Sequence, residues 1–301
     1  MSFETPPSRL QLQPGPWRLL LDGLHARFPQ IGRERWRDRL LRGRVLDLHG
    51  RALAVDAPYQ VGQQLQYFRE VELEAPIPGE VLIIHRDADL LVVDKPHGLP
   101  VAPTGRYLHE TVLSRLQRDL GLAELAPLHR IDRDTAGLLL FSLRRDSRDA
   151  YAELFRQRRI EKRYQAVAPA IPLPSLPCCR RSRLAPGEPF FRMQEVEGDP
   201  NSETWIERVE GAGDLALYAL RPISGRKHQL RVHMAAMGAP ILGDRLYPRW
   251  LGPTPDQFEP TLQLLAHSLS FDDPLDGRRR HFTAQRMLVR PENSTAPPPS
   301  E

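Results

Sequence analysis

The sequence has 301 residues, of which 41% are hydrophobic and 27% charged, so it can form one large domain and a small one. No stretch approaches the ~20 apolar residues of a membrane span, and residues 1–7 lack the features of a secretory signal, so we expect a cytoplasmic protein without membrane contact. The formal net charge of +4 is too small to single out a nucleic-acid partner. The two cysteines, Cys178 and Cys179, are adjacent, which excludes a cysteine zinc site and disfavours a structural disulfide.

The basic residues are almost all arginine. Among 42 basic residues only Lys95, Lys162 and Lys227 are lysines. A genome-wide codon bias toward arginine explains this composition without a functional cause. Under such a bias, a lysine that persists indicates a local requirement.

The N-terminal region predicts a disordered tail followed by two helices. Residues 1–15 are rich in proline and show no periodicity. From Trp17 to Phe28, apolar residues recur at helical spacing, and Pro29 ends this first helix. A second helix is expected over residues 33–42, surrounded by arginines. Its inward residues should be Trp36, Leu40 and Leu41.

A short hairpin is expected next, with residues 44–46 and 52–55 pairing through His49-Gly50. This helix-helix-hairpin order over residues 16–74 resembles the small αL RNA-binding module of a small-subunit ribosomal protein. The resemblance implies a small α/β module that contacts RNA. The alternative is a solvated helix face on which Glu34 and Asp38 pair with the arginines.

Residues 72–80, with two prolines and a glycine, predict a linker. A second domain is therefore expected over residues 78–290, followed by a disordered tail over residues 291–301. Two β-rich runs, residues 81–84 and 90–93, predict a hairpin. The second run leads into the turn Lys95-Pro96-His97-Gly98-Leu99-Pro100, in which we expect Lys95 to be structural or to face a phosphate.

Two carboxylates and two guanidiniums lie directly before an apolar run that ends at Phe141. They belong to the segment His129-Arg130-Ile131-Asp132-Arg133-Asp134-Thr135-Ala136-Gly137. Such a run predicts a strand buried on both faces, so Asp132 should lie at the mouth of a core. Buried carboxylates are costly unless they are paired. The alternative is a polar turn in which Asp and Thr side chains bind their own backbone.

A helix is expected after Asp146 or Ser147, either of which could cap it. A strand over residues 161–167 follows and contains Tyr164. A tyrosine in a strand is most often half-buried for packing alone. Residues 171–190 are rich in Pro, Arg and Ser and predict a long loop.

Residues 224–238 combine basic and apolar positions. Leu230, Met234 and Met237 share one face at helical spacing, Ser224 is a possible cap, and Gly238 closes the helix. The alternative is a solvated basic helix face. A late strand is expected over residues 264–271.

Four motifs occur in one order: Lys-Pro-x-Gly-Leu-Pro from Lys95, His-Arg-Ile-Asp-x-x-Thr-Ala-Gly from His129, Lys-x-Tyr from Lys162, and Ser-Gly-Arg-x-His-Gln-x-Arg-x-His from Ser224. Over residues 81–285 the sequence resembles the RluA-like pseudouridine synthases. The resemblance implies an α+β fold with a mixed, mainly antiparallel sheet, preceded by the small N-terminal α/β module. It also implies that Asp132 is catalytic, that Tyr164 packs on the target base and that Arg231 pairs with Asp132. The residues expected to contact RNA or the base are Arg130, His129, Lys95, Arg226, Lys227, His228 and Leu230.

The reaction that the resemblance implies is the isomerisation of uridine to pseudouridine in large-subunit ribosomal or transfer RNA, by a monomer. It is redox-neutral and needs no metal or nucleotide cofactor, and the sequence has neither Gly-x-Gly-x-x-Gly nor a P-loop. Asp132 would act as nucleophile or as base, and Arg130 would fill the gap left by the target base. One alternative is a catalytically inactive RNA-binding protein. The other is a metal-dependent phosphoesterase built from His129, Asp132, Asp134, His228, His233 and Asp244.

Overall fold

The computed structural model describes residues 7–70, 74–105, 107–172, 175–252 and 261–289, and it divides the chain into two compact units, Met1–Glu74 and Ala75–Glu301. Among these residues, the helices are too short or too polar to cross a bilayer. The tail expected over residues 291–301 lies outside the described part of the chain.

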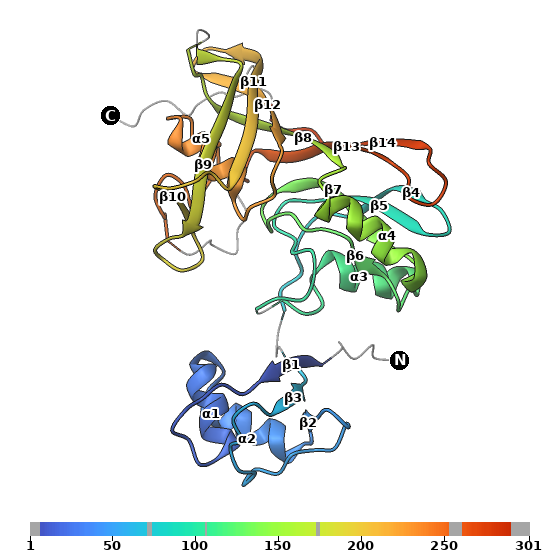
Figure 1. Ribbon diagram of the computed structural model, residues 1–301, viewed down its shortest axis with the longest axis vertical. Coiled ribbons are helices and arrows are strands. Elements are labelled where there is room, and N and C mark those ends of the chain that lie inside the picture. Colours follow the sequence, from blue (N-terminus) through green and yellow to red (C-terminus); the bar gives the residue numbers. More distant parts are fainter. Residues whose placement is uncertain (1–6, 71–73, 106, 173–174, 253–260, 290–301) are drawn as a thin grey trace. The chain divides into compact units, whose positions relative to one another are not determined.

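The first unit packs two helices and a short 3₁₀ turn on a three-stranded antiparallel sheet with the order β1-β3-β2 (Figure 1). Its core contains Leu20, Leu24, Trp36 and Leu65, each essentially inaccessible. The expected helices are confirmed in position. The elements of this unit are β1 (Ser8–Gln11), α1 (Leu20–Arg27), η1 (Pro29–Ile31), α2 (Arg33–Leu41), β2 (Val45–Asp47) and β3 (Gln64–Tyr67).

Three details of the first unit differ from the sequence-based expectation. Ser8–Gln11 forms a strand inside the expected tail, because it pairs with β3 and buries Leu10. The expected hairpin is reduced to one bridge between Leu46 and Ala52, since β2 pairs with β3 instead. Leu41 is 65% exposed, whereas Arg39 is buried over the Trp36 ring.

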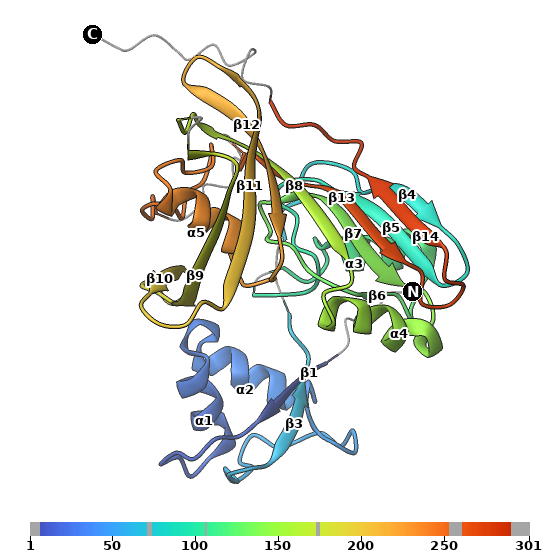
Figure 2. The ribbon, with the colours of Figure 1, turned by 45° about the horizontal axis from the view of Figure 1, so that its top comes forward.

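The second unit is built on one 11-stranded sheet with the order β10-β9-β11-β12-β8-β13-β7-β5-β4, to which β14 adds at β13 and β6 at β7 (Figures 1 and 2). β13 and β7 run parallel, and the other strand pairs that the structure describes are antiparallel. The strands are β4 (Leu82–Arg86), β5 (Leu90–Lys95), β6 (Ala126–Pro127), β7 (Ala136–Ser142), β8 (Glu161–Pro169), β9 (Cys178–Pro186), β10 (Met193–Val196), β11 (Ser202–Ala212), β12 (Leu215–Pro222), β13 (Leu264–Asp272) and β14 (Arg279–Thr283).

Helices cover both faces of the β5–β7 half of the sheet. On one face α3 (Val112–Leu120) packs against Leu139 and Phe141, and on the other α4 (Arg145–Arg156) packs against Leu138 and Leu140. Successive strand residues point to opposite faces, so every residue of β7 is buried. This confirms the strand that the apolar run predicts. α5 (Gln229–Ala236) lies beside β9 and β10 at the far half of the sheet (Figure 2).

Three expectations for the second unit are wrong. The loop predicted over residues 171–190 contains β9, which pairs with β11 although it is rich in arginine, because its outer side chains reach solvent. Neither Asp146 nor Ser147 caps α4, since the helix begins earlier and Ser147 is buried. Ile77, placed in the linker, is only 4% exposed, and its amide donates to Glu110. The second unit therefore begins before residue 78.

Candidate active site

The segment that carries Asp132 is fixed by a close approach of two strands. Gly137 has a φ of +107°, and a Cβ there would lie 2.3 Å from the carbonyl oxygen of Ala266. Since a side chain would collide with the β13 backbone, only glycine allows β7 to run against it. The Thr135 amide donates to the Asp132 carbonyl at 3.2 Å and closes the turn that precedes β7. Asp132 thus lies just before the point where the parallel strand pair begins.

The Asp132 carboxylate faces two side chains from the α5 region. Its Oδ2 lies 3.4 Å from Nη1 of Arg231, and its Oδ1 lies 3.9 Å from Nε2 of His228. The structure therefore brings Asp132 and Arg231 together. The side chain of Asp132 is 26% exposed, however, so the carboxylate can still reach a substrate.

The principal partner of Arg231 is Asp244, not Asp132. Nε and Nη2 of Arg231 each donate to an Asp244 oxygen at 2.7 Å, a bidentate pair in which both side chains are buried. Asp244 also accepts from the amides of Leu246 and Tyr247. Burial acts to lower the pKa of Arg231, but Asp244, with Asp132 adding to it, outweighs burial and raises that pKa above its usual value. Arg231 is therefore a fixed, permanently charged group beside Asp132.

The start of α5 differs from the expectation that Ser224 caps it. His228, with a φ of +55°, is the residue before the helix. The Ser224 hydroxyl instead donates to the side-chain oxygen of Gln229, which also accepts from the Arg226 amide. Gln229 in turn donates to Thr204 of β11. This buried network ties the helix start to the sheet.

His228 lies between Asp132 and Tyr247. Its Nδ1 shares a 2.8 Å hydrogen bond with the Tyr247 hydroxyl, and the two rings meet edge to face. Burial lowers the pKa of His228 to about 4, although Asp132 pulls it the other way. The imidazole is therefore neutral at physiological pH. The motif points to His228, but nothing in the sequence pairs it with Tyr247.

Tyr164 reaches the same region from β8. Its ring packs with the α3-side core and with the α5-side core, so it lies where the two meet. Burial raises the pKa of Tyr164 above its usual value, and the negative charge of Asp132 adds a smaller shift in the same direction. The hydroxyl therefore keeps its proton close to the carboxylate.

Two residues expected to contact RNA have structural roles instead. Lys95 is fully buried, and its Nζ donates to the carbonyl oxygens of Pro96 at 2.9 Å and Arg133 at 2.7 Å. It is structural, and the phosphate-facing alternative is wrong. The His129 ring stacks on Phe155, and its Nε2 accepts from the Leu140 amide, so the ring is bound within the fold. Burial lowers the pKa of His129 to about 3.

The other expected RNA contacts divide by exposure. Arg130 and Lys227 are exposed and have no hydrogen bond or ion pair to the described part of the chain. Arg226 is exposed as well and donates to the Asn201 carbonyl. Leu230 is buried in the core beneath α5, so its role is packing and not contact with a base.

Two of the histidines named for the metal-dependent alternative are engaged elsewhere. Nδ1 of His233 is hydrogen-bonded to Thr204, and its Nε2 to Ser182 and Ser202. His129 is bound elsewhere, as described above. Over the described ranges, no three His, Cys, Asp or Glu side chains are arranged to hold a metal ion.

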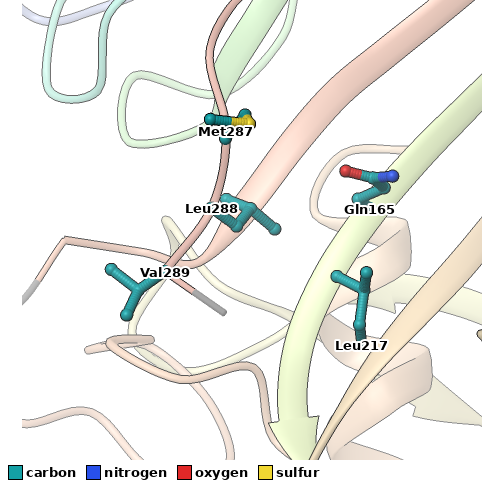
Figure 3. Close-up of a pocket in the computed structure, with 5 residues that line it drawn as sticks. All are labelled: Gln165, Leu217, Met287, Leu288 and Val289. Atoms are coloured by element: carbon teal, nitrogen blue, oxygen red, sulfur yellow. The ribbon is translucent and has the colours of Figure 1, made fainter. Parts of the chain in front are cut away.

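A small pocket lies apart from this site, lined by Gln165, Leu217 and residues 287–289 (Figure 3). Gln165 follows Tyr164 in β8, and successive strand residues face opposite sides of the sheet. The pocket is therefore on the face away from Asp132.

A mixed, mainly antiparallel sheet presents a partly exposed aspartate beside a fixed arginine, and comparison with known proteins shows that the class of this protein is that of the pseudouridine synthases. Residues 89–236 match the family described as RNA pseudouridylate synthase. The chain is 32% identical over 242 residues to an uncharacterized RNA pseudouridine synthase of Synechocystis, a match that spans 76% of this chain and 79% of that protein. It is 36% identical over 208 residues to the dual-specificity RNA pseudouridine synthase RluA of Escherichia coli, spanning 68% and 92%.

A solved structure of human RNA pseudouridylate synthase domain containing 4 matches 69% of this chain and 89% of its own, with a TM-score of 0.54 and 27% identity. The chain belongs to the RluA-like family of RNA pseudouridine synthases. It is an isomerase that converts uridine in RNA to pseudouridine. The α+β fold that the motifs imply for the larger unit is confirmed.

Proposed function

We propose that this enzyme isomerises specific uridines in large-subunit ribosomal or transfer RNA, and that Asp132, Tyr164 and Arg231 are its catalytic residues. The observation that carries the assignment is the contrast between a partly exposed carboxylate and the buried, bidentately held guanidinium 3.4 Å from it. A relative described as a dual-specificity RNA pseudouridine synthase supports action on more than one RNA. We also propose that the enzyme acts as a monomer in the cytoplasm.

The reaction breaks the bond from N1 of uracil to C1′ of ribose, turns the base, and joins C5 to C1′. N1 gains a proton and C5 loses one, so no electron is exchanged with a cofactor. The exposed edge of the Asp132 carboxylate acts on the ribose as nucleophile or as base. Arg231 holds that carboxylate in one orientation, because its own position is fixed by Asp244.

An enzyme that works on a base must take it out of the stack. Tyr164 supplies a ring for the flipped uracil, and its raised pKa keeps the hydroxyl neutral beside Asp132. Arg130 is exposed and close in sequence to Asp132, so it is suited to fill the gap in the RNA. The exposed Arg226 and Lys227 are suited to phosphates.

Asp132→Asn tests the assignment directly. The amide keeps the size of the side chain but loses its charge and basicity, so we expect unchanged RNA affinity and a loss of activity of ~10²- to 10⁴-fold or more. The measurement is tritium release from RNA labelled at uridine C5.

The matched control is Asp134→Asn, two residues away. The Asp134 carboxylate pairs with Arg133 at 2.8 Å. It interacts with Arg231 through longer-range electrostatics, without a hydrogen bond or ion pair between the two in the described part of the chain. We expect this variant to keep most of its activity. Residual activity of more than a few per cent in Asp132→Asn would show that Asp132 is not the catalytic residue.

A further inference from the structure

Three aromatic side chains, the exposed Phe190 and Trp250 and the half-buried Phe191, form a surface cluster that we call the aromatic ledge. The ring centroids of Phe190 and Phe191 are 5.5 Å apart at 76°, and those of Phe191 and Trp250 are 5.5 Å apart at 74°. Phe190 is 84% exposed and Trp250 is 42% exposed. Two loops supply these rings, the connection from β9 to β10 and the segment that follows Asp244.

Folding alone gives no reason for this exposure. A large aromatic side chain stabilises the fold through the area that it removes from water, and Phe190 removes little. Scattered single apolar residues on a surface are ordinary, whereas adjoining exposed aromatic rings indicate a contact surface. The edge-to-face packing on Phe191 still holds the outer rings in place, so they are presented in a fixed arrangement.

Both loops are fastened to the residues beside Asp132. The Met193 amide donates to the Tyr247 hydroxyl at 2.8 Å, and the Arg192 guanidinium lies over the Tyr247 ring and donates to the Pro248 carbonyl. The same Tyr247 hydroxyl is hydrogen-bonded to His228, whose Nε2 is 3.9 Å from Asp132. A continuous set of contacts thus joins the aromatic ledge to the catalytic carboxylate.

The charges in these loops suit a polyanion. Residues 188–192 and 245–250 contain three arginines and one glutamate, and Arg249, exposed, precedes Trp250 directly. Flat exposed rings next to cations are what unpaired nucleotides need, because bases stack on aromatic faces while phosphates pair with arginine.

We propose that Phe190 and Trp250 stack on unpaired bases of the RNA substrate that flank the target uridine. This inference rests on the proposed function, since it concerns the same substrate. The flipped uracil belongs to the Asp132 site, and its neighbours in a loop lose the stacking that it provided. The aromatic ledge replaces that stacking. Because every base has an aromatic face, the ledge adds affinity for unpaired RNA and does not select a sequence.

The experiment compares Phe190→Ala, Trp250→Ala and the double variant with the full-length wild type. The probes are a fluorescein-labelled RNA stem-loop with uridines in its loop and a duplex of the same stem without the loop. Loss of one stacked base by alanine substitution weakens single-strand binding by ~5- to 100-fold. We expect each single variant to raise the Kd and the KM for the stem-loop by that order while kcat and duplex affinity stay unchanged. Phe190→Tyr and Trp250→Phe keep a ring and should restore stem-loop affinity.

The matched control is Trp205→Ala. Trp205 is also 42% exposed and has an arginine over its ring, but it faces away from the α5 side, because its strand neighbours Thr204 and Ile206 are buried there. We expect no change in stem-loop binding for this variant.

The inference is overturned if the double variant binds the stem-loop as the wild type does, as it would if the ledge served a protein partner. Equal losses on stem-loop and duplex also overturn it, since stacking on unpaired bases cannot cause them. Tritium release by the wild type is measured separately. A wild type that binds but releases no tritium refutes the proposed function, while the binding comparison still decides the ledge.

Discussion

Lys95 and Arg231 are two buried basic residues near Asp132, and they differ in the groups that their side chains contact. Lys95 ends β5, and its amine reaches two backbone carbonyl oxygens. Arg231 lies in α5, and its guanidinium reaches the Asp244 carboxylate through two bonds and Asp132 through a third, longer contact. Both side chains are almost inaccessible to water.

As a consequence, Arg231 keeps its positive charge, whereas Lys95 gives up its proton more easily. Burial lowers the pKa of Lys95 to about 7, although Asp134 and Asp132 act against the shift. Burial acts on Arg231 in the same direction, but Asp244 outweighs it. A neutral amine still has two N–H groups, enough for both of its acceptors. Lys95 thus holds the Asp132 segment through the Arg133 carbonyl, whereas Arg231 supplies the positive charge.

The largest effect is expected for Arg231→Met, which removes the charge and strands a buried carboxylate at Asp244. Loss of one partner of a buried pair costs ~3 to 5 kcal/mol of the free energy of unfolding. Because Asp132 then loses the group that orients it, kcat should fall by about 100-fold or more. Urea unfolding and single-turnover tritium release measure the two effects.

Arg231→Lys sharpens the same test. Lysine keeps a positive charge but cannot form the bidentate pair with Asp244, so stability and kcat should lie between those of the methionine variant and the wild type. A methionine variant with wild-type kcat would mean that Arg231 only supports the fold of α5.

A smaller, pH-dependent effect is expected for Lys95→Met. Since the folded pKa is lowered, the unfolded chain binds more protons between pH 7 and 10, and the Lys95 contribution to the free energy of unfolding rises with pH. Between pH 7 and 9 the wild type should gain about 2 kcal/mol relative to the variant. Unfolding curves of both proteins at several pH values give this difference in the free energy of unfolding. The contributions of the other titrating groups cancel because both proteins contain them.

Lys227→Met is the matched control for this prediction. Lys227 is exposed, so its replacement removes a lysine without disturbing the core. A parallel pH dependence in the wild type and the Lys95→Met variant would show that the buried amine keeps its charge in the folded state.

The same pair of cations shows what the sequence could predict. The apolar run predicts β7 and places Asp132 at its start, because a strand of that composition must be buried on both faces. The resemblance of the motif around Arg231 to that of the family implies its proximity to Asp132. That Asp244 is the main partner of Arg231 depends on the loop after α5, whose path is set by Gly243 against the Thr261 backbone. No local pattern predicts that contact.

Side-chain direction and non-local strand pairing account for the other differences. His129 and Arg130 are neighbours in one motif, yet the His129 ring stacks on Phe155 within the fold, whereas the Arg130 side chain is exposed. β9 is hidden from sequence patterns because it is rich in arginine, and one of its two partners, β11, lies beyond β10 in the chain. Whether a motif residue meets substrate or core is decided by such tertiary contacts.

The smallest effect is expected in the first unit, where arginines are numerous but largely compensated. Arg33 pairs with Asp22 and Arg37 with Glu34, and Glu70 accepts from Arg42. Such exposed pairs leave little net charge for a phosphate. This matches the solvated-face alternative for α2. We nevertheless propose that the unit contacts RNA, as the αL resemblance implies, through weak electrostatic contacts.

The double variant Arg35→Gln and Arg37→Gln in the full-length protein tests this contact. Both side chains are exposed on α2, so folding should not change. If each meets one phosphate, affinity for a long RNA should fall by a few-fold, and the slope of log affinity against log salt should decrease by about 1 per contact. The matched control is Arg278→Gln, which replaces an arginine of the second unit whose side chain is 81% exposed.

A double variant with the affinity and salt slope of that control would mean that the arginines of α2 only pair with the carboxylates of their own unit. A fragment that begins at Ala75, so that Ile77 keeps its bond to Glu110, should then bind the long RNA as tightly as the full-length protein does.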